Sequence, residues 1–376
     1  WVKPMGKFDL KLKKDYRAIG RGIGLCIGCS TFPTWNTVPG VYANLMAGNP
    51  TIVKPHSKSV LPIAIVVAEI QKALQEAGFS GDQIQLAVDS QKEPITKLLA
   101  EHEAVQLIDY TGGSSFGEYI EKLDNKTTFT EKAGVNSLII DGVKDMQKVA
   151  GNIAFSTCLY SGQMCTAPQN IFVPEQGIKT AEGTLSYDEV VKHIAEAIKG
   201  LVENPKAGPY TLGAIQNDRT ATRVKEMAAK SQVALDSIAV KHPEFESARM
   251  MSPVLITCSE DDIDQWQNEC FGPALFVVKT KDSNRSLAHA KRSAQEIGAI
   301  TCALYSNDEG FIEKVVSEMN MAFTPVSVNF RGAAFVNQHA AFSDFHVTGG
   351  NPSGNAGFTN PEYVNKRWIW VGNRYS

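Results

Sequence analysis

Short apolar runs and longer amphipathic stretches alternate along the first third of the chain. The runs are bounded by Gly, Pro or polar residues, as buried strands are, and the stretches carry apolar residues at the spacing of one helical face. The pattern predicts strands at residues 22–28, 50–55, 84–88 and 105–110 and helices at residues 38–47 and 61–77. Because strand and helix alternate in this way, we expect a doubly wound nucleotide-binding sheet.

The rest of the chain predicts a second α/β unit without an internal repeat. Strands are expected at residues 136–140, 170–173, 275–278 and 299–305. Near the start of the chain, apolar and charged residues alternate from Phe8 to Lys13, which predicts a half-exposed strand that packs between subunits. The Gly- and Asn-rich residues 348–360 predict a long loop at the entrance of a site.

Length and charge narrow the class of protein. A chain of 376 residues exceeds the size at which one core usually stops growing, so two domains are expected. The net charge of −3 and the absence of a basic cluster argue against nucleic acid as a partner. The longest apolar run, residues 60–68, contains Pro62 and is too short to span a bilayer, so no membrane partner is expected.

The seven cysteines are odd in number and scattered, which indicates thiols in a reducing cytoplasm. The pair Cys26 and Cys29 has CxxC spacing, but no second pair completes a zinc site, and we predict no metal. The chain starts with Trp1 rather than Met, so we expect a native N-terminal region to be missing.

One cysteine is a candidate nucleophile. Cys165 follows a flexible Gly162-Gln163 step and is surrounded by small or polar residues, which predicts a loop. Glu131, upstream of it, is a candidate base. A thiol that attacks a carbonyl and a carboxylate that activates water are the two groups that covalent catalysis on a carbonyl requires.

A Gly-rich segment is a candidate phosphate site. The glycines between Gly20 and Gly28 fail the GxGxxG pattern, because the last spacing is wrong and a strand follows. Residues 111–117, with Gly112 and Gly113, instead follow a strand and open a helix whose first N–H groups could face an anion. A plain Gly-rich helix cap explains the same residues equally well.

Five motifs in order resemble the aldehyde dehydrogenase superfamily over essentially the whole chain from about Phe8. They are Lys54-Pro55, Thr111-Gly112-Gly113, Glu131-Lys132-Ala133-Gly134, Gly162-Gln163-Met164-Cys165 and Glu269-Cys270-Phe271-Gly272-Pro273. Within the superfamily, residues 130–137 and 342–352 look most like the enzymes named for phenylacetic acid degradation.

The resemblance implies a Rossmann-type cofactor domain, an α/β catalytic domain and a small β oligomerisation element. The expected boundaries are oligomerisation strands at 1–20, an NAD(P)-binding domain at 21–132, a catalytic domain at 133–355 and a C-terminal oligomerisation segment at 356–376. A cytoplasmic homodimer or homotetramer is expected. The resemblance implies as substrate an aldehyde that arises in aromatic-acid catabolism, such as a ring-opened semialdehyde, free or linked to coenzyme A.

The resemblance also implies roles for single residues. Cys165 would attack the aldehyde, and Glu131 would activate the water that hydrolyses the resulting thioester to an acid. Members that transfer the acyl group to coenzyme A generally lack this base, although Pro55-His56 weakly suggests such an enzyme. A homologue that kept the fold and lost the chemistry is a third reading.

Cofactor contacts follow from the same match. Lys54 and Glu269 would hold the adenosine and nicotinamide riboses, and Phe271 would lie beside the nicotinamide. Where NAD-preferring members usually carry a Glu, this chain has Ser57. The missing carboxylate removes repulsion against a 2′-phosphate, and Lys54 and Lys58 could supply positive charge. We therefore predict that NADP is accepted at least as well as NAD.

The oxyanion position departs from the family pattern. A gapless match places Thr31 where the family usually has an Asn, and nearby Asn36 is the alternative. The backbone N–H of Cys165 would be the second donor in either case. Losing a good oxyanion donor typically reduces the rate about 10²–10³-fold, so one of the two side chains is expected to donate.

Overall fold

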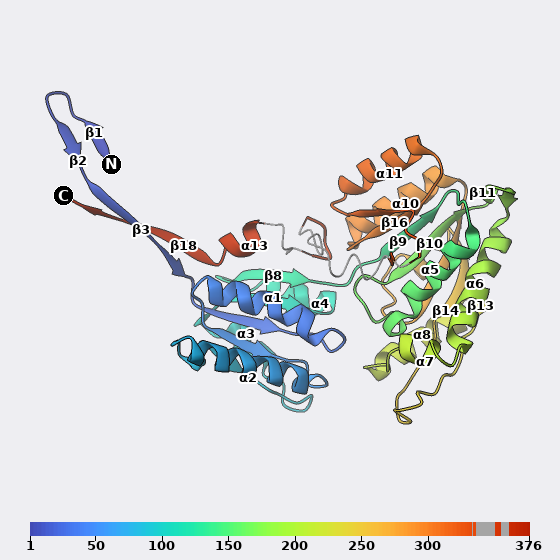
Figure 1. Ribbon diagram of the computed structural model, residues 1–376, viewed down its shortest axis with the longest axis horizontal. Coiled ribbons are helices and arrows are strands. Elements are labelled where there is room, and N and C mark those ends of the chain that lie inside the picture. Colours follow the sequence, from blue (N-terminus) through green and yellow to red (C-terminus); the bar gives the residue numbers. More distant parts are fainter. Residues whose placement is uncertain (333, 336–349, 355–360) are drawn as a thin grey trace. The chain divides into compact units, whose positions relative to one another are not determined.

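The computed structural model describes residues 1–332, 334–335, 350–354 and 361–376. The chain forms two compact units, one of Trp1–Thr130 with Asn360–Ser376 and one of Glu131–Thr359. Each unit is built around a sheet with helices packed on it (Figure 1). Most of the loop predicted at residues 348–360 lies outside the described residues.

The first unit contains a five-stranded sheet in the order β6-β5-β4-β7-β8. β4 pairs in parallel with β5 and β7, and β5 pairs in parallel with β6. Because the chain runs outward from β4 in one direction and then in the other, the sheet is doubly wound, as predicted. The strands are β4 (Ile23–Ile27), β5 (Thr51–Lys54), β6 (Ile84–Leu86), β7 (Val105–Thr111) and β8 (Thr127–Glu131).

Helices cover both faces of this sheet because strand side chains alternate between two apolar clusters. Leu25 and Ile27 lie in the cluster that contains Ile120 of α4, whereas Cys26 between them lies in the cluster that contains Ile63 of α2. The helices are α1 (Pro33–Met46), α2 (Val60–Glu76), α3 (Thr96–Glu101) and α4 (Ser114–Glu121), with the 3₁₀ turn η1 (Gly81–Gln83). The helix predicted from residue 38 begins earlier because its first residue is a proline, which needs no N–H partner there.

The two ends of the chain form an antiparallel ribbon. β3 (Lys13–Gly20) pairs with β18 (Trp368–Tyr375) along its whole length, and Figure 1 shows these blue and red strands side by side. β1 (Val2–Pro4) pairs with β2 (Asp9–Lys11). The strand predicted at residues 8–13 is therefore divided between β2 and β3, and β2 is exposed rather than half-buried.

Arg367 anchors β18 to the five-stranded sheet. Its guanidinium is fully buried and donates to both carboxylate oxygens of Asp109 on β7, at 2.6 and 2.8 Å. It also donates to Asn44 Oδ1 on α1 at 2.6 Å and to Tyr363 O on α13 (Pro361–Asn365) at 2.8 Å. A buried ion pair is tolerated here because the charged groups have hydrogen-bond partners as well as each other.

The second unit contains a seven-stranded sheet in the order β13-β14-β15-β10-β9-β16-β17. All neighbouring strands are parallel except β13 and β14. The four predicted strands are the four adjacent strands β15, β10, β9 and β16, whose burial on both faces produces continuous apolar runs. The strands are β9 (Asn136–Ile140), β10 (Pro168–Pro174), β13 (Gln232–Leu235), β14 (Val254–Ser259), β15 (Ala274–Thr280), β16 (Cys302–Tyr305) and β17 (Val326–Val328).

Helices α5 (Met146–Cys158) and α6 (Tyr187–Glu203) pack on one face of this sheet. Helices α8 (Asp218–Ala229), α10 (Ser283–Glu296) and α11 (Glu309–Asn320) pack on the other (Figure 1). The shorter elements are η2 (Leu159–Gly162), α7 (Gly208–Thr211), α9 (Ile263–Trp266), β11 (Ile178–Thr180) and β12 (Gly183–Leu185). In the part of the chain that the structure describes, no helix combines the length and the apolar character needed to cross a bilayer.

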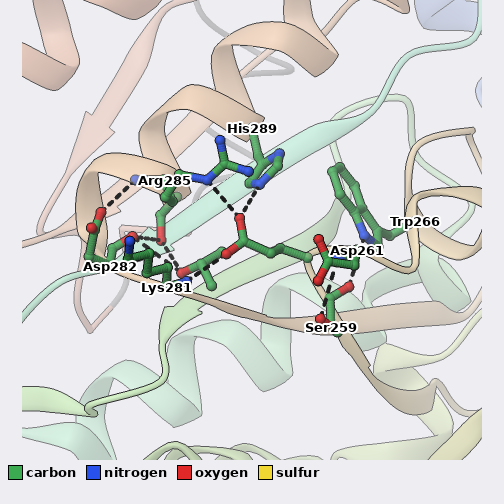
Figure 2. A network of polar contacts seen from close by, with 10 residues as sticks. Ser259, Asp261, Trp266, Lys281, Asp282, Arg285 and His289 are labelled. Atoms are coloured by element: carbon green, nitrogen blue, oxygen red, sulfur yellow. Dashed lines mark hydrogen bonds and ion pairs between the residues drawn. The ribbon is translucent and has the colours of Figure 1, made fainter.

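A polar network joins the end of β14 to α10. Figure 2 shows Arg285 and His289 directed at one carboxylate, that of Glu260, which accepts from Arg285 Nε at 2.8 Å and contacts His289 Nε2 at 2.6 Å. Burial raises the pKa of Glu260, but its hydrogen bonds outweigh this and hold that pKa below its usual value. Burial beside Trp266 lowers the pKa of His289.

The lowered pKa of His289 predicts a loss of stability in mild acid. The unfolded chain, with an ordinary histidine pKa of 6.5, takes up this proton before the folded protein does, so stability falls as the pH drops below about 6.5. We expect His289→Gln to flatten the fall in the urea midpoint between pH 8 and pH 5.5, and His193→Gln on α6 to leave it as in the wild type. Equal slopes for wild type and His289→Gln would contradict this.

Candidate functional site

Three segments with predicted chemistry precede neighbouring strands of the second unit. Glu131 lies just before β9, Cys165 just before β10 and Glu269 just before β15. These strands are adjacent and parallel, in the order β15-β10-β9. Because the amino ends of parallel strands share one edge of a sheet, the fold brings the three segments to the same edge.

The loop that carries Cys165 has a strained backbone. Beyond α5, Tyr160, Ser161 and Gly162 have positive φ angles of 55°, 54° and 63°. This conformation costs a non-glycine residue about 1–3 kcal/mol and persists only where the surroundings hold it. At Gly162 the space is also closed, since a Cβ atom would lie 2.6 Å from the carbonyl oxygen of Gly272. Glycine is therefore required at this position.

The buried side chain of Gln163 holds the turn in place. Its Nε2 donates to the carbonyl oxygens of Tyr160 and Ala214 at 3.0 Å each, and its Oε1 accepts from the N–H of Gln216 at 2.9 Å. The Gly162-Gln163 step, which the sequence indicates as flexible, is thus held by hydrogen bonds to both the oxygen and the nitrogen of the Gln163 amide. A rigid turn presents the residues that follow it, including Cys165, in one direction.

Asn136, the first residue of β9, connects the Cys165 loop to the sheet. Its Nδ2 donates to the carbonyl oxygens of Cys165 at 2.8 Å and Ala167 at 2.9 Å. Its Oδ1 accepts from the N–H groups of Ile300 and Thr301, at 3.0 and 3.1 Å, just before β16. No role was predicted for Asn136 beyond its place in the strand and in the likeness of residues 130–137; a polar amide that opens a fully buried strand was the available signal.

Gln169 on β10 holds the segment around Glu269 in the same way. Its Oε1 accepts from the N–H of Cys270 at 2.7 Å, and its Nε2 donates to the carbonyl oxygen of Asn268 at 3.0 Å. Both neighbours of Glu269 are therefore fixed to the strand that follows Cys165. No sequence motif marks Gln169, because its partners lie about 100 residues away along the chain.

Glu269 has a raised pKa. Burial raises its pKa to about 7, and the hydrogen bond from the N–H of Gly134 and the charge of Arg223 limit the rise. Arg223 also donates to the carbonyl oxygen of Phe271 at 2.8 Å. The half-exposed ring of Phe271 and the carboxyl of Glu269 thus belong to one ordered segment.

Glu131 is the last residue of β8 and is half-buried. It pairs as an antiparallel bridge with Gly354, and the N–H of Lys132 donates to the carbonyl oxygen of Ser353 at 2.7 Å. The described residues 350–354 therefore support the backbone on which the candidate base lies. A Cβ atom at Gly134 would come 2.9 Å from that of Ser353, so the two segments pack closely.

Accessibility separates the cysteines. All seven lie in described residues and none is in a disulfide. Cys165 and Cys29 are half-buried, whereas burial raises the pKa of the other thiols: Cys26, Cys158, Cys258, Cys270 and Cys302. Because the thiolate is the nucleophile, a buried thiol with a raised pKa is a poor candidate. Cys165 thus has the more reactive setting within the second unit.

The predicted cofactor residues of the first unit lie at the carboxyl ends of its strands. Lys54 ends β5, and its Nζ is 2.6 Å from Oδ1 of Asp89, three residues after β6. Both side chains are nearly inaccessible, at 9% and 3% exposed. Ser57 is half-buried three residues after Lys54. Sequence reasoning missed Asp89, since an isolated acid in a polar loop carries no pattern.

The two glycines of the Gly112-Gly113 turn differ in the space around them. A Cβ atom at Gly112 would lie 2.4 Å from Oη of Tyr110, which donates to the carbonyl oxygen of Gly113 at 2.9 Å. A Cβ atom at Gly113 would meet nothing within 4 Å. Gly113 is the N-cap of α4 and provides no side-chain cap. The first turn of α4 therefore has room for an external acceptor.

Both oxyanion candidates lie beside one thiol in the first unit. Oγ1 of Thr31 is 3.7 Å from Sγ of Cys29, which donates to Oδ1 of Asn36 at 3.4 Å. Asn36 lies in the first turn of α1. Thr31 and Asn36 belong to one unit and Cys165 to the other, so the oxyanion role of either stays a prediction. Among the described side chains, no group of three or more His, Cys, Asp or Glu could hold a metal ion.

Comparison with known proteins finds relatives that are aldehyde dehydrogenases or share their fold. The model of the aldehyde dehydrogenase family matches residues 16–365. A crystal structure of an NAD-dependent aldehyde dehydrogenase from Burkholderia multivorans is 42% identical, with a TM-score of 0.96, and the match covers 100% of this chain and 68% of that one. Glyceraldehyde-3-phosphate dehydrogenase GapN from Methanocaldococcus jannaschii, at 18% identity and a TM-score of 0.73, shares the fold over 100% of this chain and 76% of its own.

A curated relative is more distant and longer. The 1-pyrroline-5-carboxylate dehydrogenase of Bacillus cytotoxicus is 24% identical over 338 residues, which are 87% of this chain. The chain spans 62% of the length of that relative.

Proposed function

The chain belongs to the aldehyde dehydrogenase family, and on that premise we propose that the protein oxidises an aldehyde to a carboxylic acid with NAD or NADP, through Cys165. The observation that carries the proposal is the convergence of the Glu131, Cys165 and Glu269 segments at one edge of the second sheet. The relative from Burkholderia multivorans, an NAD-dependent aldehyde dehydrogenase, supports it.

Each step has a residue that fits it. Sγ of Cys165 forms a bond to the carbonyl carbon, and a hydride then leaves that carbon, which becomes a thioester. Glu131 takes a proton from water, the water oxygen attacks the thioester carbon, and the carbon–sulfur bond breaks. Atoms balance as aldehyde plus water plus oxidised cofactor giving acid, reduced cofactor and a proton. The strained, hydrogen-bonded turn before Cys165 supports a nucleophile held in one position.

The residues present fit a dinucleotide. The open N-terminus of α4 at Gly112 and Gly113 suits a phosphate. Lys54, at the end of β5, and Ser57 after it would hold the adenosine ribose. Glu269 and Phe271 would hold the nicotinamide half. When bound, the nicotinamide accepts the hydride.

The proposal extends to the substrate, a semialdehyde, and to the assembly, a homo-oligomer. The likeness of residues 130–137 and 342–352 to phenylacetic acid degradation enzymes supports a semialdehyde of aromatic catabolism. A homo-oligomer is supported by the apolar side chains exposed on the β3–β18 ribbon, whose edges have no further strand among the described residues. These side chains are Tyr16, Ile19, Ile369, Trp370, Val371 and Tyr375.

The test is a panel of aldehydes assayed with NAD and NADP on the full-length protein, with and without coenzyme A. We expect a free acid as product, and we expect Glu131→Gln to slow turnover about 10²–10⁴-fold because water is no longer activated. Mass spectrometry of Glu131→Gln should then find an acyl group on Cys165.

Glu118→Gln on the exposed face of α4 is the matched control and should turn over like the wild type. An acyl-coenzyme A product in place of the acid would replace the hydrolytic assignment with acyl transfer. No oxidation of any aldehyde would refute the proposed activity.

A further inference from the structure

We propose that Asp89 selects the cofactor, favouring NAD, whose adenosine ribose carries free 2′ and 3′ hydroxyls, over NADP with its 2′-phosphate. The inference rests on the proposed function, because it assumes that a dinucleotide binds. It concerns the first unit alone, where Asp89 and Lys54 form their ion pair.

The Lys54–Asp89 pair lies at the strand end where doubly wound sheets bind the adenosine ribose. In such sheets the residue at the carboxyl end of the second strand contacts the adenosine ribose, and there a carboxylate accepts from the 2′ hydroxyl. The second strand of this sheet is β5, and its last residue is Lys54. β6 lies beside β5, and the loop after β6 returns Asp89 to Lys54 Nζ at 2.6 Å. The carboxylate thus reaches the ribose position from the neighbouring strand.

The carboxylate of Asp89 is held in place by two contacts. Oδ1 pairs with Lys54, and Oδ2 accepts from the N–H of Ile95 at 3.1 Å. Its side chain is 3% exposed. Because the side chains of Lys54 and Asp89 are only 9% and 3% exposed, the pair acts on a bound ribose through its fixed charges rather than through an open hydrogen-bonding surface.

The charges around the pair oppose a 2′-phosphate. The positive charge of Lys54 is matched by the negative charge of Asp89 at 2.6 Å. Burial lowers the pKa of the neighbouring His56, the charges of Lys54 and Lys58 lower it further, and the charge of Asp89 raises it. A dianionic phosphate would therefore meet a fixed carboxylate and a neutralised lysine, and poorly screened like charges repel strongly.

Asp89 changes the conclusion that Ser57 alone supports. The NADP preference predicted from Ser57 counts the positive charges of Lys54 and Lys58 and assumes that no carboxylate lies near the ribose. The Lys54–Asp89 pair offsets the charge of Lys54 and supplies such a carboxylate, which leaves Lys58 as the remaining positive charge. A carboxylate supplied by the β6 loop performs the selection that a carboxylate at position 57 would perform.

The test is isothermal titration of the full-length protein with NAD, NADP, 5′-AMP and 2′,5′-ADP, a binding measurement independent of turnover. For the wild type we expect the Kd of NADP to exceed that of NAD at least about tenfold, and 2′,5′-ADP to bind correspondingly more weakly than 5′-AMP. In Asp89→Asn the NADP to NAD ratio of Kd values should fall at least about fivefold. Glu93→Gln, which removes an exposed charge from the same loop, should keep the wild-type ratio.

Distinct outcomes refute distinct claims. A folded wild type that binds neither dinucleotide refutes the proposed function. A wild type that binds NADP as tightly as NAD, or an Asp89→Asn variant that keeps the wild-type ratio, refutes only the role of Asp89. Asp89→Ser, which retains a hydroxyl acceptor for the N–H of Ile95, replaces Asp89→Asn if circular dichroism shows that the latter is unfolded.

Discussion

Cys165→Ala is expected to reduce kcat/KM for every aldehyde substrate at least about 10³-fold, the scale seen when a catalytic nucleophile is removed. Without Sγ no covalent adduct forms on the carbonyl carbon, and Glu131 has no thioester to hydrolyse. The measurement is the rate of reduced-cofactor formation, followed by the absorbance of the reduced nicotinamide.

The control for Cys165→Ala is Cys258→Ala, which removes a buried thiol from β14 of the same unit. It should keep wild-type turnover. Titration of both variants with NAD or NADP separates loss of chemistry from loss of binding, since Cys165→Ala should bind the cofactor as the wild type does. A Cys165→Ala enzyme that still oxidises aldehydes would remove Cys165 from the mechanism.

Arg367→Met is expected to lower the free energy of unfolding by about 3–5 kcal/mol, because it leaves the carboxylate of Asp109 buried without its cation. Asp109 is 8% exposed and Arg367 is fully buried. The variant also breaks the hydrogen bonds from the guanidinium to Asn44 and Tyr363, and it removes the contact with the Phe129 ring, whose centroid lies 4.1 Å away. Urea unfolding followed by tryptophan fluorescence measures the loss.

The control for Arg367→Met is Lys366→Met at the adjacent residue. Lys366 is exposed and its Nζ lies 2.6 Å from a carboxylate oxygen of Glu362. Exposed pairs contribute about 0–1 kcal/mol, so this variant should unfold close to the wild type. The double variant Arg367→Met with Asp109→Leu should recover part of the loss, since it removes the unpaired charge. Equal stabilities of Arg367→Met and Lys366→Met would contradict a structural role for the buried pair.

The central strands of both sheets were predictable because burial on two faces writes a continuous apolar run into the chain. Residues 23–27 and 275–278 are examples, and both lie in strands. Partly exposed strands such as β13 and β17 escaped prediction because their side chains face two environments and show a weaker pattern. The end-to-end ribbon was also missed as a pairing, since β3 and β18 lie at opposite ends of the sequence.

Some residues of the candidate site could likewise be predicted from the sequence, and others could not. Cys165, Glu131 and Glu269 carry motifs that a single sequence displays, and Gly112 and Gly113 stand in a local turn. The residues that hold them, Asn136 and Gln169, do so through contacts with partners distant along the chain. No local pattern records a contact of that kind.

By itself, then, the sequence determined what is local: two α/β units, the family, a loop with Cys165, an acid at Glu131 and a serine at position 57. Only the tertiary structure decided which residues support these groups and which charges face them. The Lys54–Asp89 pair shows the physical reason, because it joins the ends of two neighbouring strands across 35 positions of sequence. A carboxylate acts on a ligand through distance and burial, and the fold alone specifies both.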